Sequence, residues 1–158
     1  MAAQKMLVVG GLFFLLVSML YGSIYATFYL DHFSQERKAA LQNGFNDKLA
    51  AETNASRYEN TLRAAGQHRS SHSHFALFGL IALAVGVGIQ YINLSELWLK
   101  ITAVIFLCGG FILPFGVFLE PMYNKDIGSL VAMIGGILIT LATTAFLVGA
   151  WRYQASRS

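Results

Sequence analysis

Apolar residues gather in four long runs along this chain, and the links between the runs are polar. Each run is about 20 residues or longer, which is the length that a helix needs to cross roughly 30 Å of hydrocarbon. The pattern therefore predicts an all-α fold, an integral membrane four-helix bundle that forms a single transmembrane domain over residues 1–158. The predicted spans cover residues 6–30, 75–94, 97–119 and 127–151.

The one long polar segment, residues 31–73, lies between the first and second runs and holds most of the charged residues. Its charges alternate in sign, which is typical of a solvated helical face with many ion pairs. Leu41, Phe45 and Leu49 recur at every fourth position, which gives the segment an apolar stripe. These features predict a helical extramembrane insertion between helices 1 and 2.

Local signals divide this insertion into two short amphipathic helices. Ser56 and Glu59 fit a capping box at the start of a helix, and Gly66 fits a helix stop. We therefore expect a break near Thr53 and Asn54, between the two helices.

Small residues recur at every fourth position in two of the runs, and such residues let helices approach closely within a bilayer. The first run contains Ser18, Gly22 and Ala26 at this spacing. The last run contains the longest series, which consists of Gly128, Ala132, Gly136, Thr140 and Thr144. We expect this series to be a packing face of the bundle, so that a Gly136→Leu substitution would disrupt the bundle.

The composition excludes several classes of function and leaves the fold prediction unchanged. The chain is 56% hydrophobic and 12% charged, with a net charge of +3, whereas a soluble domain is about 25% charged. No basic face or base-stacking motif accompanies the positive balance, so we exclude nucleic acid as a partner. The single cysteine, Cys108, cannot form an internal disulfide or a CxxC redox pair. No hydrolase, zinc-peptidase or nucleotide-binding motif occurs, so we do not expect an enzyme.

Two stripes of large side chains need cover beyond what the bundle provides. Tyr21, Tyr25 and Tyr29 recur at spacing four near the end of the first run. They form either an aromatic belt at the membrane interface or a hydrogen-bonding rail toward a cofactor or partner. Together with the insertion stripe that contains Phe45, they predict a protein partner or a homo-oligomer in addition to the lipid bilayer. Tyr25→Ala and Phe45→Ala are expected to release this partner and to leave the monomer folded.

Histidines gather before the second run, where imidazole can ligate haem iron, copper or zinc. His68 and His72 are four apart and share a helix face, whereas His72 and His74 lie roughly 200° apart around a helix. His32 follows the first run, and Glu120 closes the third run, on the same predicted membrane face. Four interpretations stay open: cofactor binding by His72, His74 and His32, metal binding by His68, His72, His74 and Glu120, pH sensing, and polar capping at the water boundary.

The stretch from His72 to Gly79 reads H-x-H-x-x-x-x-G. It resembles the opening of a helix in some haem-copper-type respiratory membrane proteins, over residues 72–79 alone. The resemblance implies that His72 and His74 are ligands of haem or copper. The third and fourth runs contain no histidine that would complete a bis-histidine pair.

We predict a non-catalytic accessory or partner-binding subunit of a larger membrane complex, with respiratory and photosynthetic assemblies as candidate settings. The alternative is a small haem- or metal-binding membrane protein that transfers electrons through the His72 and His74 cluster. No charged residue lies deep within a predicted span, which argues against a pump, an ion-coupled transporter or a channel.

An even number of spans places both termini on one side of the membrane. The basic tail with Arg152 and Arg157 follows a helix end directly. Because basic residues near span ends favour the cytoplasm, we expect cytoplasmic termini and an insertion, residues 31–73, on the outer side.

Overall fold

The computed structural model describes residues 2–46 and 51–155, which are almost entirely helical. The elements are α1 (Ala2–Ile24), the π-helix η1 (Tyr25–Tyr29), α2 (Leu30–Asn46), α3 (Ala51–Gly88), the 3-10 helix η2 (Ile89–Tyr91), α4 (Glu96–Met122) and α5 (Lys125–Ala155). The predicted all-α, four-helix arrangement is confirmed. Four stretches are long and apolar enough to cross a membrane, so the chain is an integral, multi-pass membrane protein.

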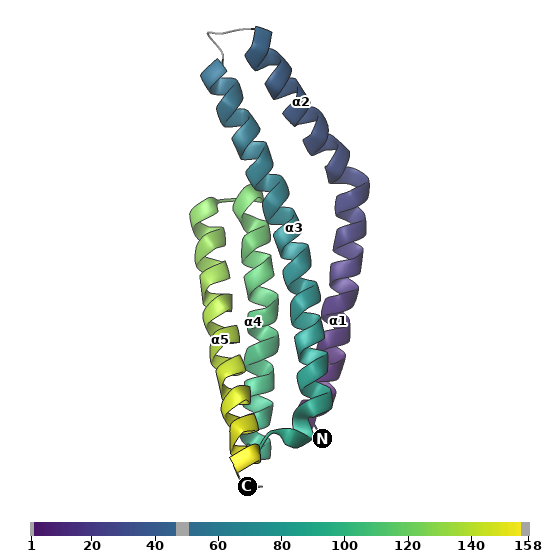
Figure 1. Cartoon of the computed structure of the whole chain (residues 1–158), viewed down its shortest axis with the longest axis vertical. Coiled ribbons are helices and arrows are strands. Elements are labelled where there is room, and N and C mark those ends of the chain that lie inside the picture. Colours follow the sequence, from purple (N-terminus) through teal and green to yellow (C-terminus); the bar gives the residue numbers. More distant parts are fainter. Residues whose placement is uncertain (1, 47–50, 156–158) are drawn as a thin grey trace.

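The helices form two antiparallel hairpins of unequal length that lie side by side (Figure 1). The long hairpin runs up through α1, η1 and α2 and returns through α3, whereas α4 and α5 form the short hairpin. Helix α4 packs against both α3 and α1, and α5 packs mainly against α4. Both termini lie at the same end, and the upper part of the long hairpin, which we call the stalk, extends beyond the ends of α4 and α5 (Figure 1).

Residues 31–73 lie in two helices, as predicted, but the break expected near Thr53 and Asn54 is wrong, and neither helix is a short separate element. Helix α2 continues from the first span through η1, and α3 runs without interruption from Ala51 to Gly88. Thr53, Asn54 and the Ser56–Glu59 box therefore lie inside α3, as does Gly66. The helix tolerates Gly66 because a single exposed glycine costs only about 1 kcal/mol, whereas tertiary packing stabilises the helix on both sides of it.

A regular seam on α3 explains why this helix is continuous. The positions that face the other helices alternate between three and four residues apart along the whole element, as in a coiled coil. They are Thr61, Ala65, His68, His72, Phe75, Gly79, Ala82 and Gly86, all buried or half-buried. The backbones of α1 and α3 are closest where Gly11 and Gly79 meet: a Cβ on Gly11 would lie 2.8 Å from the carbonyl oxygen of Gly79.

The short hairpin packs through small residues spaced by seven. Gly128, Gly135, Ala142 and Gly149 are buried on α5, and Thr102, Gly109 and Gly116 are buried on α4. A Cβ on Gly135 would overlap the backbone nitrogen of Leu113, whereas a Cβ on Gly136 would meet only the Leu113 side chain, at 3.6 Å. The predicted packing role of Gly136 is therefore wrong, because Gly135 occupies the contact.

Side-chain caps begin α4 and α5, after the links that precede these two helices. Ser95 accepts a hydrogen bond from the Trp98 backbone and begins α4, and the Asn93 backbone N–H donates to the carbonyl of Gly149 at 2.9 Å. At the other end, the Asn124 side chain accepts from the Asp126 and Ile127 backbones and begins α5.

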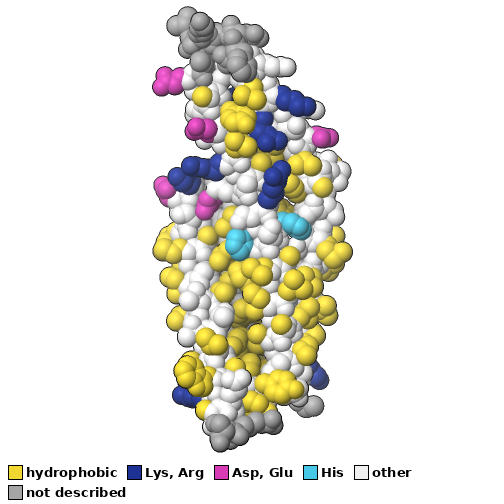
Figure 2. Space-filling view, in the orientation of Figure 1, with side chains coloured by type: hydrophobic (Ala, Val, Ile, Leu, Met, Phe, Trp, Pro, Cys, Tyr) yellow, Lys and Arg dark blue, Asp and Glu magenta, His cyan; other side chains and the backbone are white. Residues whose placement is uncertain are grey.

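The surface divides into an apolar part and a charged part. In Figure 2 hydrophobic side chains cover the lower portion and charged side chains cover the stalk, with histidine side chains at the boundary between them. The core of the lower portion contains Leu7, Phe14, Phe78, Phe106 and Phe146. This arrangement places the histidines at the level where the hydrocarbon ends.

Candidate functional site

The tyrosine stripe of the first helix faces α3 within the same chain. Tyr25 is 8% exposed and donates from its hydroxyl to the carbonyl of Ala65 at 3.4 Å. Its ring stacks on Tyr29, with centroids 6.5 Å apart and an interplanar angle of 9°. The π-helix η1 contains both residues, and its wider turn, closed by the Leu30 N–H on the carbonyl of Tyr25, keeps Tyr29 on the inward face.

His68 is the centre of this site and is 4% exposed. Its Nδ1 is hydrogen-bonded to the hydroxyl of Tyr21. The imidazole also lies 5.4 Å from the ring of Tyr29 and 5.9 Å from that of Tyr25, centroid to centroid. The aromatic cage around His68 consists of Tyr21, Tyr25, Tyr29, Phe33 and Phe118. It joins α1, η1, α2, α3 and α4 at a single level of the molecule.

His72 lies one turn further along α3 and faces α1, as its spacing from His68 predicts. Its Nδ1 is 2.8 Å from the carbonyl oxygen of Ser18, and the Ser18 hydroxyl donates to the carbonyl of His72 at 3.0 Å. Gly22 lies beside the ring: a Cβ there would be 2.6 Å from Cε1 of His72. Ser18 and Gly22 therefore form a recess for this imidazole, whereas their four-residue spacing predicted only a surface for close helix packing.

The other candidate ligands are each directed elsewhere. His74 Nδ1 donates to the carbonyl of Ser70 on its own helix at 2.7 Å. His32 is exposed and pairs with Glu36 at 3.6 Å. Glu120 on α4 accepts a hydrogen bond from the side-chain amide of Gln67 on α3. The structure thus brings His68 and His72 onto one face but does not gather the four histidines around a common point.

Within residues 2–46 and 51–155, no group of three or more His, Cys, Asp or Glu side chains is placed to hold a metal ion. Ligation by His72 and His74 together is difficult because α3 is a regular helix at these positions and the two rings leave it on different faces.

The residues of the predicted partner surface differ in their accessibility. Tyr21 and Tyr29 are half-buried and Tyr25 is buried, all by contacts within this chain. Leu41 on the stalk is 46% exposed. Leu49 lies outside the described residues, and so does the side chain of Phe45.

Sequence reasoning missed Phe33, Phe118 and Gln67. Phe33 continues the four-residue spacing of the three tyrosines into the charged segment, and this continuation was the available signal. Phe118 and Gln67 meet their partners only through the packing of α4 on α3, and no local pattern indicates that contact.

The cage has the chemistry of a polar clamp. A phenol and an imidazole share a hydrogen bond while aromatic rings shield them from water, and such shielding strengthens the bond. The arrangement can fix the positions of α1, α3 and α4 relative to one another where the polar stalk meets the apolar spans.

Comparisons with known proteins add no family to this description. No protein-family model, no curated protein and no solved structure matches the chain. The molecule is defined by its fold and site as a four-helix membrane protein with a helical stalk.

Proposed function

We propose that this chain is a non-catalytic, partner-binding subunit of a larger membrane complex, and that a transmembrane helix of the partner packs on the outer face of α5. The partner is either a second copy of this chain or another subunit. Respiratory and photosynthetic assemblies are the candidate settings.

The observation that carries this proposal is a surface of small side chains on α5 that the other helices of the bundle do not cover. Thr140 and Thr144 are exposed, and their hydroxyls donate to the carbonyls of Gly136 and Thr140 on their own helix at 2.9 and 2.8 Å. These hydroxyls therefore need no hydrogen-bond partner on a neighbouring helix, and the small side chains allow another backbone to approach closely. In a bilayer, helices associate through such small-residue faces, because lipid provides no hydrophobic drive.

The stalk supplies a second surface for a partner. It extends beyond α4 and α5 (Figure 1), and Leu41 and Leu62 are exposed on it. Covering leucines on a charged helical hairpin outside the hydrocarbon removes apolar surface from water, which favours binding of a protein there. The alternative is a haem- or metal-binding electron-transfer protein, for which His68 and His72 on one face of α3 are the candidate ligands.

The orientation is also a proposal. We infer that the termini face the cytoplasm and that residues 31–73 lie on the outer side. Arg152 in the last turn of α5 supports this choice, since it is exposed directly at the end of a span.

The test is gentle extraction of the full chain from its native membrane, followed by native mass measurement. The unaltered protein should carry a partner chain or a second copy. Gly136→Leu and Thr140→Leu should lose this partner while the remaining chain keeps its helical content. Ala84→Leu on α3, at a small residue that is exposed like Thr140, is the matched control and should keep the partner. An unaltered protein that is recovered only as a monomer with lipid would contradict the proposal.

A further inference from the structure

A small polar pocket lies where α3 passes the upper ends of α4 and α5. Its volume is about 260 Å³, and we call it the boundary pocket. The residues that line it include Asn60, Arg63, Gln67, Glu120, Pro121 and Lys125. The pocket is lined by Glu120 and Pro121 near the end of α4 and by Lys125 at the start of α5, where two of the apolar stretches end, so we place it at the height of the lipid headgroups.

In the boundary pocket the carboxylate has a hydrogen-bond partner, whereas the two cations make no ion pair. Glu120 accepts a hydrogen bond from Gln67, a neutral amide. Arg63 and Lys125 make no ion pair, because the ion pairs among the described residues are His32–Glu36 and Lys100–Glu96. The pocket therefore presents two exposed cations whose nearby carboxylate is bonded to another group.

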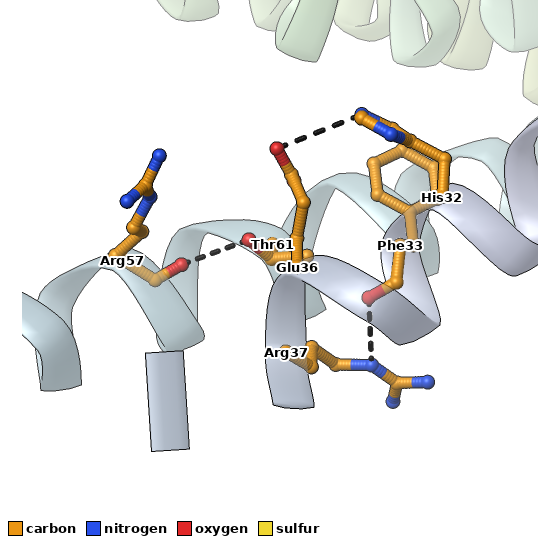
Figure 3. A network of polar contacts seen from close by, with 6 residues as sticks. All are labelled: His32, Phe33, Glu36, Arg37, Arg57 and Thr61. Atoms are coloured by element: carbon orange, nitrogen blue, oxygen red, sulfur yellow. Dashed lines mark hydrogen bonds and ion pairs between the residues drawn. The ribbon is translucent and has the colours of Figure 1, made fainter. Parts of the chain in front are cut away.

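A neighbouring crevice repeats this pattern. Its volume is about 590 Å³, and it shares Asn60 and Pro121 with the boundary pocket. Glu36 and Arg57 also line it. Figure 3 shows Glu36 directed to His32, whereas no ion pair reaches the guanidinium of Arg57. Arg57, Arg63 and Lys125 thus make no ion pair among the described residues, although Glu59 and Asp126 lie close to them in the sequence, and their cationic groups are available to bind an external anion.

We propose that the boundary pocket binds the phosphate of an anionic phospholipid headgroup, through Arg63 and Lys125. Arginine donates a planar pair of N–H groups that matches phosphate oxygens, and lysine adds a mobile point charge. Basic residues between helices at the membrane surface are suited to anionic headgroups. Asn60 supplies a further neutral hydrogen-bonding group at the same opening.

A free phosphate ion would offer the same chemistry as the headgroup, and position favours the lipid. The pocket lies at the upper ends of α4 and α5, and Figure 2 shows that the surface changes from charged to apolar along the molecule. A phospholipid can place its phosphate at this boundary and its chains on the apolar surface below. A soluble phosphate gains nothing from that surface.

The test reconstitutes the full chain into nanodiscs of phosphatidylcholine with and without phosphatidylglycerol, and counts retained lipids by native mass spectrometry. The pocket variant is Arg63→Gln with Lys125→Gln. The matched control is Lys5→Gln with Lys38→Gln, which removes the same charge from exposed positions away from the pocket. We expect the pocket variant to retain phosphatidylglycerol at least roughly tenfold more weakly, and the control to match the unaltered protein.

Three outcomes would overturn the proposal. One is equal retention of phosphatidylglycerol by the pocket variant and the unaltered protein. Another is equal loss in both double variants, which would show an effect of net charge alone. The third is binding of inorganic phosphate in phosphatidylcholine nanodiscs without any preference for phosphatidylglycerol, which would assign the site to a soluble anion. Circular dichroism confirms in each case that the variants keep their helices.

Discussion

At the scale of single residues, the molecule solves the problem of a polar side chain near hydrocarbon by local pairing. A buried imidazole without a partner would cost several kcal/mol in an apolar medium (of the order of 2–7). His68 has Tyr21 and His72 has Ser18, and both partners lie on α1. The pairs therefore tie α1 to α3 at two adjacent turns.

Removing one hydroxyl tests the first pair. Tyr21→Phe keeps the ring in the cage but leaves the His68 Nδ1 without its partner. We expect the free energy of unfolding to fall by about 1–3 kcal/mol, measured by denaturant titration in mild detergent. Tyr123→Phe, at a position that is 81% exposed, is the control and should be neutral. Equal stability of Tyr21→Phe and the unaltered protein would show that the bond contributes nothing.

Truncating Tyr25 distinguishes a core residue from a partner contact. The sequence predicts that Tyr25→Ala releases a partner and leaves the monomer folded, but the ring is buried by α3 and its aromatic neighbours. We now expect a loss of about 3 kcal/mol or more in the monomer. Phe28→Ala lies in the same π-helix, is 71% exposed and should change stability little. Thermal unfolding of both variants in detergent decides between the two roles, and an unchanged melting temperature for Tyr25→Ala would restore the partner interpretation.

At the scale of helices, spacing by seven rather than by four sets the contacts. Each step of four residues rotates the position by about 40° around a helix. The series from Gly128 to Thr144 therefore begins against α4 and ends on the outer face. Positions seven apart stay within about 20° of one another, so Gly128, Gly135, Ala142 and Gly149 follow the neighbouring helix.

The adjacent glycines of α5 give a matched test of this geometry. Gly135→Ala places a methyl group against the backbone of Leu113, and we expect a cost of about 1–3 kcal/mol. Gly136→Ala meets only a flexible side chain and gains helix propensity, so it should be neutral or stabilising by up to roughly 1 kcal/mol. Unfolding in detergent compares the two. A larger loss for Gly136→Ala would contradict the observed packing.

The four spans could be predicted because the length of an apolar run is read directly from the sequence, and the bilayer thickness sets the length that a span requires. Sequence reasoning misplaced the helix break and selected Gly136 in place of Gly135 as the packing residue, because capping patterns and four-residue spacing also occur where tertiary packing overrides them. The tyrosines and His68 were predicted as candidate binding residues, but their pairing depends on the axial register between α1 and α3. The reciprocal contact of Gly11 and Gly79 helps to set that register, and no single-helix pattern encodes it.

At the scale of the whole molecule, continuous helices couple the membrane part to the stalk. The first arm passes from α1 through η1 into α2, and α3 spans both regions in a single element. The cage around His68 lies at the junction. A partner that binds the stalk would therefore act on the two arms that carry His68 and most of the cage, without any hinge made of loop residues in the described part of these arms.

The topology can be measured directly. Four spans place both termini at one end, as Figure 1 shows, so a compartment-sensitive reporter fused to either terminus should report the same side of the membrane. We expect the cytoplasmic side, because Lys5, Lys100 and Arg152 lie near the lower ends of the spans with only Glu96 among the acidic residues there, and Lys100 pairs with it at 3.1 Å. The upper end has more basic residues, including Arg63 and Lys125, but it also has most of the carboxylates. Opposite readings from the two termini would contradict the four-span fold. Two readings from the outer side would keep the fold, reverse the orientation and place the boundary pocket in the cytoplasmic leaflet.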